Sequence, residues 1–168
     1  MASKAPALIL LFVNLVLYFI VIVIAAWAIN HGIERSREAA SVLSIPARIF
    51  PIYLPIGNMA TGFFVILSLL AGVVGFTTSL TGLHNVVTWN LSDLHTAAFS
   101  SLASLSLTIL ALGLACKEFQ GGWTGSNLRT LEVLTVIVSA TQLFSTFAIQ
   151  VGADDVSAQE RARLGGRV

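Results

Sequence analysis

Long apolar stretches separated by short polar segments dominate this sequence. They cover residues 7–29, 59–83, 94–116 and 128–151, and each contains 23 to 25 residues with almost no formal charge. Because an α-helix rises about 1.5 Å per residue, roughly 20 apolar residues cross a hydrocarbon core of about 30 Å. Backbone polar groups inside lipid must be satisfied within their own segment, so each stretch is predicted to be a transmembrane helix.

The composition agrees with a protein whose solvent is lipid. Hydrophobic residues make up 56% of the 168 residues and charged residues only 10%, which leaves too little polar surface for a water-soluble globule of this size. The predicted fold class is all-α, a polytopic membrane protein built as a four-transmembrane-helix bundle. We predict one membrane domain over residues 1–152, with both termini on one side, and a polar, flexible tail over residues 153–168.

Charge and cysteine content exclude several functions. The formal net charge is +1 and no basic stripe exists, so nucleic acid is not an expected partner. The single cysteine, Cys116, cannot form an internal disulfide. His84, Asp93 and His95 flank the predicted second loop, but their spacing is a weak metal signal and favours ordinary interface residues. The sequence contains no nucleophile–base set or phosphate loop, so we predict neither an enzyme nor a cofactor or metal site.

The segment between the first two predicted spans is rich in proline. Pro46, Pro51 and Pro55 alternate with apolar residues over residues 45–56. Proline at this density prevents a regular helix, while the apolar content argues against a freely solvated loop. We expect the segment to lie in the headgroup region or to cap the bundle, with an ordinary loop as the alternative.

Small and polar residues within the spans indicate how the helices associate. Because lipid is as apolar as leucine, close packing and hydrogen bonds between helices must hold the bundle together. We predict that the second and third spans make the closest contact, through Gly72 and Gly75 on one and Ser101 and Ser104 on the other. The alternative is a polar seam for a solute, for which Gln142 is the best candidate.

Asn14 is a polar residue inside the first span. Its amide needs a partner on another helix, and we expect a serine or threonine in that role.

Ionisable residues gather where the third span ends and the fourth begins. Arg129 and Glu132 are three residues apart, so they share a helix face and can pair, and Lys117 and Glu118 lie across a short loop. One interpretation is an interfacial ion-pair cluster formed around Glu118 and Glu132. The other is a docking site for an anionic solute, in which Lys117 and Arg129 supply the positive charge.

Several sequence blocks resemble a known family. They are Asn14–Leu15 with Tyr18, Trp27–Asn30, Gly57–Val65, Ala71–Gly75, Leu114–Glu118, Leu128–Glu132 and Thr141–Leu143. Together they are similar to the signature of the AWPM family of abscisic-acid-induced plant plasma-membrane proteins. The resemblance implies a small four-span protein of the plant plasma membrane that is associated with dehydration, cold and seed maturation. It also implies transport of abscisic acid, which has been proposed for the family, and it implies no catalytic residues.

Two functions from different classes follow. The leading hypothesis is a stress-associated plasma-membrane protein that moves abscisic acid or a similar small weak acid, with Lys117, Arg129 and Gln142 as docking candidates. Four helices leave little room for an aqueous path, so this function calls for a homo-oligomer or a path at the lipid edge. The alternative is a non-transporting structural or membrane-protective protein, or an accessory subunit of a larger membrane complex. The lipid bilayer is the partner in either case.

Overall fold

The computed structural model describes residues 4–42, 59–119 and 126–165. They form the helices α1 (Lys4–Val42), α3 (Met59–Thr88), α4 (Leu91–Phe119) and α5 (Ser126–Gly165). All of these described helices are long and apolar enough to cross a membrane, and none of the described residues is in a strand. The predicted all-α bundle of four transmembrane helices is therefore confirmed.

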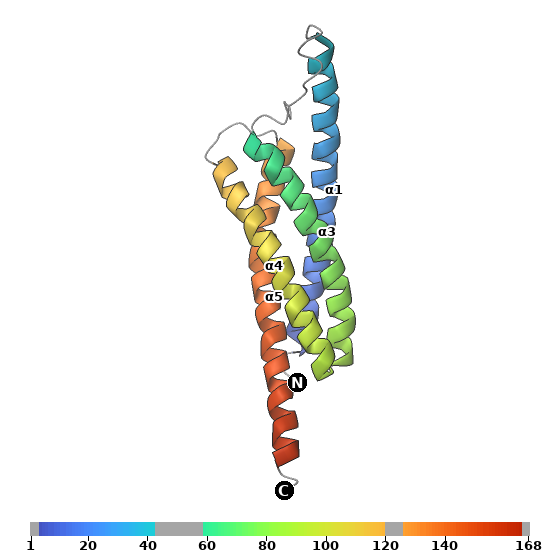
Figure 1. The fold of residues 1–168 in the computed structure, drawn as a ribbon, viewed down its shortest axis with the longest axis vertical. Helices are drawn as coiled ribbons and strands as arrows, with labels where there is room; N and C mark the ends of the chain where they lie inside the picture. Colours follow the sequence, from blue (N-terminus) through green and yellow to red (C-terminus); the bar gives the residue numbers. More distant parts are fainter. Residues whose placement is uncertain (1–3, 43–58, 120–125, 166–168) are drawn as a thin grey trace.

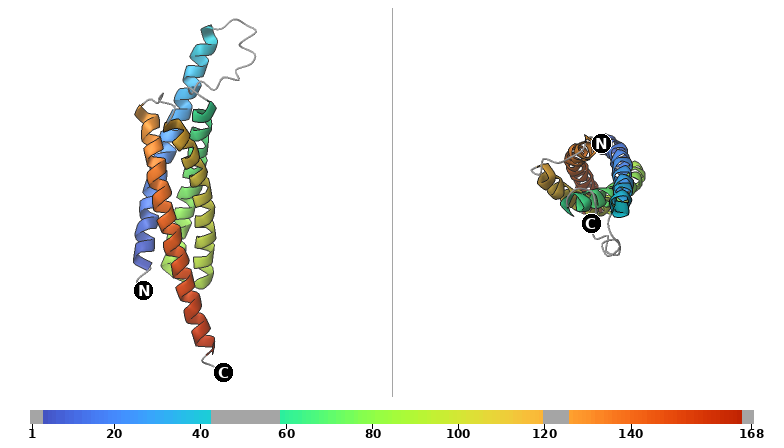
Figure 2. Two further views of the ribbon diagram at one scale, coloured as in Figure 1. Left: turned by 90° about the vertical axis from the view of Figure 1, so that its left-hand side faces the viewer. Right: turned by 90° about the horizontal axis from the view of Figure 1, so that it is seen from above.

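The helices form an up-and-down bundle in which each helix packs against the next and α5 closes the ring against α1 (Figures 1 and 2). The first residues of α1 and the last residues of α5 lie at the same end (Figure 1). We call this end, which also holds Thr88 and Leu91, the terminal end. The opposite end, which holds Thr61, Glu118 and Asn127, is the loop end.

Two helices continue past the limits that the sequence predicts. α1 runs through Val42 and extends beyond the bundle at the loop end, and α5 runs through Gly165 beyond the terminal end (Figure 1). The structure thus makes residues 153–165 helical, where the sequence analysis expected a flexible tail. Alanine, glutamate and arginine, which favour helix, occur in both extensions. The proline-rich segment at residues 45–56 lies outside the described residues.

The buried residues of each helix recur at alternating spacings of three and four, which is typical of coiled-coil-like packing. On α1 they are Ala7, Leu11, Asn14, Tyr18, Val21, Ala25 and Ala28. On α5 they include Glu132, Thr135, Ser139, Gln142 and Thr146. Soluble coiled coils have apolar residues at these positions, whereas the middle of this bundle has many polar ones.

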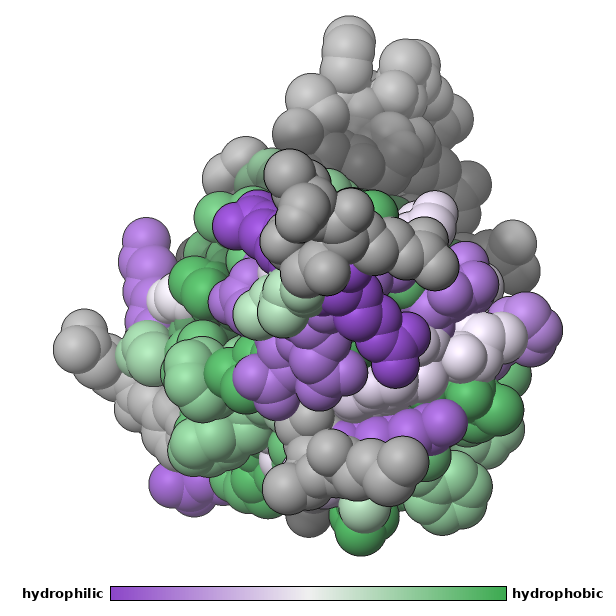
Figure 3. Space-filling model, turned by 90° about the horizontal axis from the view of Figure 1, so that it is seen from below, coloured by the Kyte–Doolittle hydropathy of each residue, from purple (hydrophilic) through white to green (hydrophobic). Residues whose placement is uncertain are grey.

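The outer surface has the opposite character. Large apolar side chains point away from the bundle, among them Phe99, which is 74% exposed, and Phe147 on α5. Viewed from the terminal end, hydrophilic residues gather over the middle of the face and hydrophobic residues occupy much of its rim (Figure 3). The sides of the bundle are therefore suited to lipid, and its polar groups lie inside and at the ends.

The glycines of α3 allow close packing against α1. A Cβ atom at Gly72 would lie 2.9 Å from Ile22 Cγ1, and one at Gly75 would overlap the aromatic ring of Tyr18. Such small-residue faces let two helix backbones approach. The sequence predicts that Gly72 and Gly75 contact the third span, whereas in the structure the atoms nearest to a Cβ at either position belong to α1. Gly75 accommodates the ring of Tyr18, and Gly72 accommodates the side chain of Ile22, both from the first span.

Apolar clusters occupy both halves of the bundle. In the loop half, Phe64, Val65 and Leu131 pack with Val21 and Val138. The cluster in the terminal half is formed by Ala7, Leu11, Val86, Leu94, Ala97, Ala98, Ile149 and Ala153. Polar side chains from α1, α4 and α5 fill the space between the two clusters, and they form the site described next.

Candidate functional site

A hydrogen-bonded network connects α1, α5 and α4 in the middle of the bundle. Asn14 Nδ2 donates to Gln142 Oε1 over 3.0 Å. Gln142 Nε2 in turn donates to both the backbone carbonyl and the hydroxyl oxygen of Ser101, each at 3.1 Å. Asn14 and Gln142 are both buried. The sequence favours serine or threonine as the partner of Asn14, whereas the structure shows that the partner is Gln142.

The same network includes the hydroxyl of Thr146. Thr146 Oγ1 donates to the Gln142 carbonyl at 2.9 Å and lies 2.6 Å from Ser101 Oγ. Because the Thr146 proton is committed to that carbonyl, Ser101 is the donor in the hydroxyl pair. Together with the bonds described above, the Gln142 amide oxygen is bonded to Asn14 of α1, and its amide nitrogen is bonded to Ser101 of α4.

Tyr18 makes a second connection across the bundle, from α1 to α4. Its hydroxyl lies 2.9 Å from Thr108 Oγ1 and 3.3 Å from Ser104 Oγ. Thr108 uses its own proton on the Ser104 carbonyl at 2.7 Å, so Tyr18 donates to Thr108. The Tyr18 ring is buried and rests in the notch at Gly75.

α3 takes little part in these connections. In the described part of the chain, it makes no side-chain hydrogen bond to another helix between Thr61 and Val87. Thr77, Thr78 and Thr81 bond to carbonyls of their own helix. The hydroxyls of Ser68 and Ser79 are buried and have no hydrogen-bond partner.

The loop end of the bundle holds two buried carboxyl groups. Glu118 on α4 is 8% exposed and accepts a hydrogen bond of 2.7 Å from Thr61 Oγ1. Glu132 on α5 is 1% exposed, and its Oε1 atom has no hydrogen-bond partner. Buried carboxyl groups are rare within membrane helices and mark functional sites by default.

The basic docking candidates are exposed, unlike these buried carboxyl groups. Lys117 and Arg129 are both exposed. Within the described residues no ion pair joins Arg129 to Glu132, whose carboxyl group is buried. Gln142 lies 13 residues beyond Arg129 on α5, which is roughly 20 Å along the helix. The structure therefore does not bring the three docking candidates together.

The remaining packing candidates are interior residues. Ser101 is buried within the Asn14–Gln142 network, Ser104 is buried beside the Tyr18 hydroxyl, and Gly72 and Gly75 are buried against α1. Sequence reasoning did not single out Ser68 or Thr135, and it placed Tyr18 only within the family resemblance. The signal that identifies them is their place in the alternating three-and-four spacing of buried positions.

Replacing Thr61 with valine is expected to destabilise the bundle by about 1–3 kcal/mol, because the substitution leaves the buried Glu118 carboxyl without its donor. Thr77→Val is the matched control, since Thr77 is exposed and bonds only to its own helix. Thermal unfolding in detergent measures both variants. Equal stability of the two variants would show that the bond to Glu118 contributes nothing measurable.

The fold and its interior define an integral membrane protein, with an apolar exterior, a polar interior and helices of membrane-spanning length. The sequence model of the AWPM-19-like family matches residues 12–152, and the chain belongs to this family. It is also similar to membrane protein PM19L of Oryza sativa subsp. japonica, with 37% identity over 163 residues that cover 96% of this chain and 84% of the rice protein. No solved structure matches the chain. The family resemblance expected from the sequence is thus confirmed.

Proposed function

We propose that this plant membrane protein lies in the plasma membrane and moves abscisic acid or a similar small weak acid across the bilayer. The observation that supports this function is the polar network of Asn14, Gln142, Ser101 and Thr146 in the middle of the bundle. Amide groups inside a membrane are costly unless they bond to one another. A bundle that served only to fill the bilayer could be built with apolar side chains at these positions.

A carboxylate solute has a plausible first contact at the loop end. Lys117 and Arg129 are exposed there, and basic groups form strong, charge-assisted hydrogen bonds with carboxylates. Gln142 offers amide chemistry further inside, once its bonds to the neighbouring helices are released. This function involves no bond making or breaking, so we assign no enzymatic role.

The size of the interior constrains the path. A cavity of about 10 Å³ lies between the helices, which is the space of about one water molecule. A hormone is far larger. Transport through this part of the described bundle would therefore require the helices to separate, and the other routes are a path between copies in a homo-oligomer or along the lipid edge.

The same hydrogen-bonded network favours a second candidate function. Both ends of the Gln142 amide are already bonded within the protein, so the network stabilises one arrangement of α1, α4 and α5. This property suits a structural or membrane-protective protein, or an accessory subunit of a larger membrane complex.

Uptake of radiolabelled abscisic acid into liposomes that contain only this protein separates the two functions. Transport predicts saturable uptake above that of protein-free liposomes and above that of liposomes made with heat-denatured protein. Uptake equal to that of the protein-free liposomes would eliminate autonomous transport and favour the structural or accessory function.

Arg129→Gln and Lys117→Gln are expected to raise the half-saturating solute concentration about tenfold, because each removes one charge-assisted contact. Arg161→Gln is the control, since Arg161 is exposed on the same helix as Arg129 but at the terminal end. Thermal stability measured beside flux separates docking from folding. Unchanged flux in both test variants would remove these residues as a docking site.

A further inference from the structure

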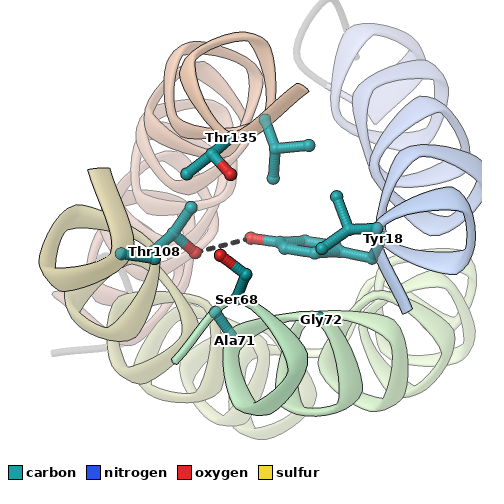
Figure 4. Close-up of a pocket in the computed structure, with 9 residues that line it drawn as sticks. Tyr18, Ser68, Ala71, Gly72, Thr108 and Thr135 are labelled. Atoms are coloured by element: carbon teal, nitrogen blue, oxygen red, sulfur yellow. Dashed lines mark hydrogen bonds between the residues drawn. The ribbon is translucent and has the colours of Figure 1, made fainter. Parts of the chain in front are cut away.

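The cavity between the helices lies on the loop side of the Asn14–Gln142 network and is lined by residues of α1, α3, α4 and α5. Four of the lining residues carry hydroxyl groups: Tyr18, Ser68, Thr108 and Thr135. Figure 4 shows the hydroxyls of Tyr18, Thr108 and Ser68 pointing toward one another across the bundle. The volume of about 10 Å³ is at the lower limit for one water molecule.

The hydroxyl protons of three of these residues are already used. Thr135 Oγ1 donates to the Leu131 carbonyl at 2.7 Å, Thr108 donates to the Ser104 carbonyl, and Tyr18 donates to Thr108. These three oxygens can therefore offer only lone pairs to a molecule in the cavity.

Ser68 is the exception among the four. Its side chain is 1% exposed, and its hydroxyl has no hydrogen-bond partner. Most hydroxyls of α3 bond to a carbonyl one turn earlier, but Ser68 Oγ lines the cavity instead. It supplies the one uncommitted proton. A ligand that fits this site must be very small, must accept one hydrogen bond and must donate up to two.

Water has this size and this set of donors and acceptors, and we propose that the cavity binds a single water molecule. The water accepts the Ser68 proton and donates to two of the three available oxygens, on Tyr18, Thr108 and Thr135. Three hydrogen bonds are typical of buried water in proteins. No charged side chain lines the cavity, so a neutral ligand is favoured.

The consequence of this water concerns α3. This helix has no direct side-chain hydrogen bond to its neighbours over the described middle of the bundle, whereas α1, α4 and α5 are bonded to one another. A water held by Ser68 joins α3 to that network through Tyr18 of α1, Thr108 of α4 or Thr135 of α5. The proposal does not depend on transport, because it rests on the cavity and the proton count alone.

Hydroxyl-radical labelling by X-ray radiolysis tests the proposal on the full chain in lipid nanodiscs. Radicals form from water, so a buried aromatic ring is labelled when a water molecule lies beside it. Tyr18 is expected to be labelled well above Phe64, which is equally buried on α3 and does not line the cavity. General opening of the bundle would label both rings alike and would overturn the proposal, as would Tyr18 labelling no higher than that of Phe64.

Substitutions test whether the water molecule is bound at Ser68. Ser68→Val fills the cavity and removes the donor, so Tyr18 labelling is expected to fall to the level of Phe64. Persistent labelling of Tyr18 in this variant would place the water elsewhere and overturn the proposal. Ser79→Ala is the control, because Ser79 also has a buried, unpartnered hydroxyl but does not line the cavity. Its Tyr18 labelling is expected to equal that of the wild type.

Thermal stability gives a second readout, and it does not require the larger valine side chain at position 68. Ser68→Ala is expected to lower Tm by about 2–4 °C, because it removes a bonded hydroxyl, while Ser79→Ala leaves Tm unchanged or higher. Equal Tm values for the two alanine variants would contradict a bonded water at Ser68. If Ser68→Val does not fold, the ratio of Tyr18 to Phe64 labelling in the wild type decides the proposal together with these Tm values.

Discussion

Gly75→Leu is expected to destabilise the bundle by about 3 kcal/mol or more and to prevent a single folded state in detergent. Even a Cβ atom at this position would overlap the Tyr18 ring, and the remaining atoms of leucine require that ring to leave its place. Displacing Tyr18 also breaks its hydrogen bonds to Thr108 and Ser104 on α4. One substitution on α3 therefore disturbs α1 directly and α4 indirectly.

Gly113→Leu on α4 is the matched control for this experiment. Gly113 is exposed, and a Cβ atom built there meets no atom within 4 Å. The same change of residue at this position should leave stability unchanged or raise it, because leucine favours helix more than glycine does. Thermal unfolding of both variants provides the comparison. A Gly75→Leu protein as stable as Gly113→Leu would show that α1 and α3 do not pack at this notch.

Gln142→Leu is expected to cost about 2 kcal/mol or more, because it leaves the buried Asn14 amide without its acceptor and removes both bonds to Ser101. Gln150→Leu is the control on the same helix, since Gln150 is exposed and should tolerate leucine. Denaturation in mixed micelles measures the free energy of unfolding of each variant.

A double-mutant cycle isolates the bond between the two amides. Asn14→Leu combined with Gln142→Leu removes both polar groups, so the double variant should be more stable than the sum of the single losses implies. The expected coupling is about 1 kcal/mol, the scale measured for hydrogen bonds between membrane helices. Additive losses would show that Asn14 and Gln142 contribute independently and that their hydrogen bond adds no stability.

The number, type and approximate positions of the helices could be predicted from the sequence because uninterrupted apolar length is a strong signal. The far ends of α1 and α5 could not, because segments rich in helix-favouring polar residues are equally compatible with helix and with a solvated chain. The partner of Gly75 was also beyond prediction. A glycine face indicates a close approach but does not identify which of the other three helices supplies the bulky residue.

Only part of the polar site could be predicted from the sequence, for a similar reason. Asn14 and Gln142 are conspicuous within apolar spans, but no spacing within one helix shows that they bond to each other across 128 positions. Tyr18 and Ser68 resemble ordinary span residues until the alternating three-and-four spacing places them inside. For Arg129 and Glu132, by contrast, the sequence suggests a contact that the structure does not form. Their spacing permits a pair, yet burial of the carboxyl group separates it from the exposed guanidinium.

The polar interior also bears on how the chain is made. The mean hydropathy of the most apolar part of each helix falls in chain order, from 3.1 for α1 through 2.2 and 1.9 to 1.5 for α5. A segment as apolar as α1 partitions into the bilayer unaided as it leaves the ribosome, whereas polar groups at the centre of a span oppose insertion. α5 carries Gln142 into the membrane last, when Asn14 and Ser101 have already been synthesised. The order of synthesis thus presents the least apolar helix with its hydrogen-bond partners on arrival.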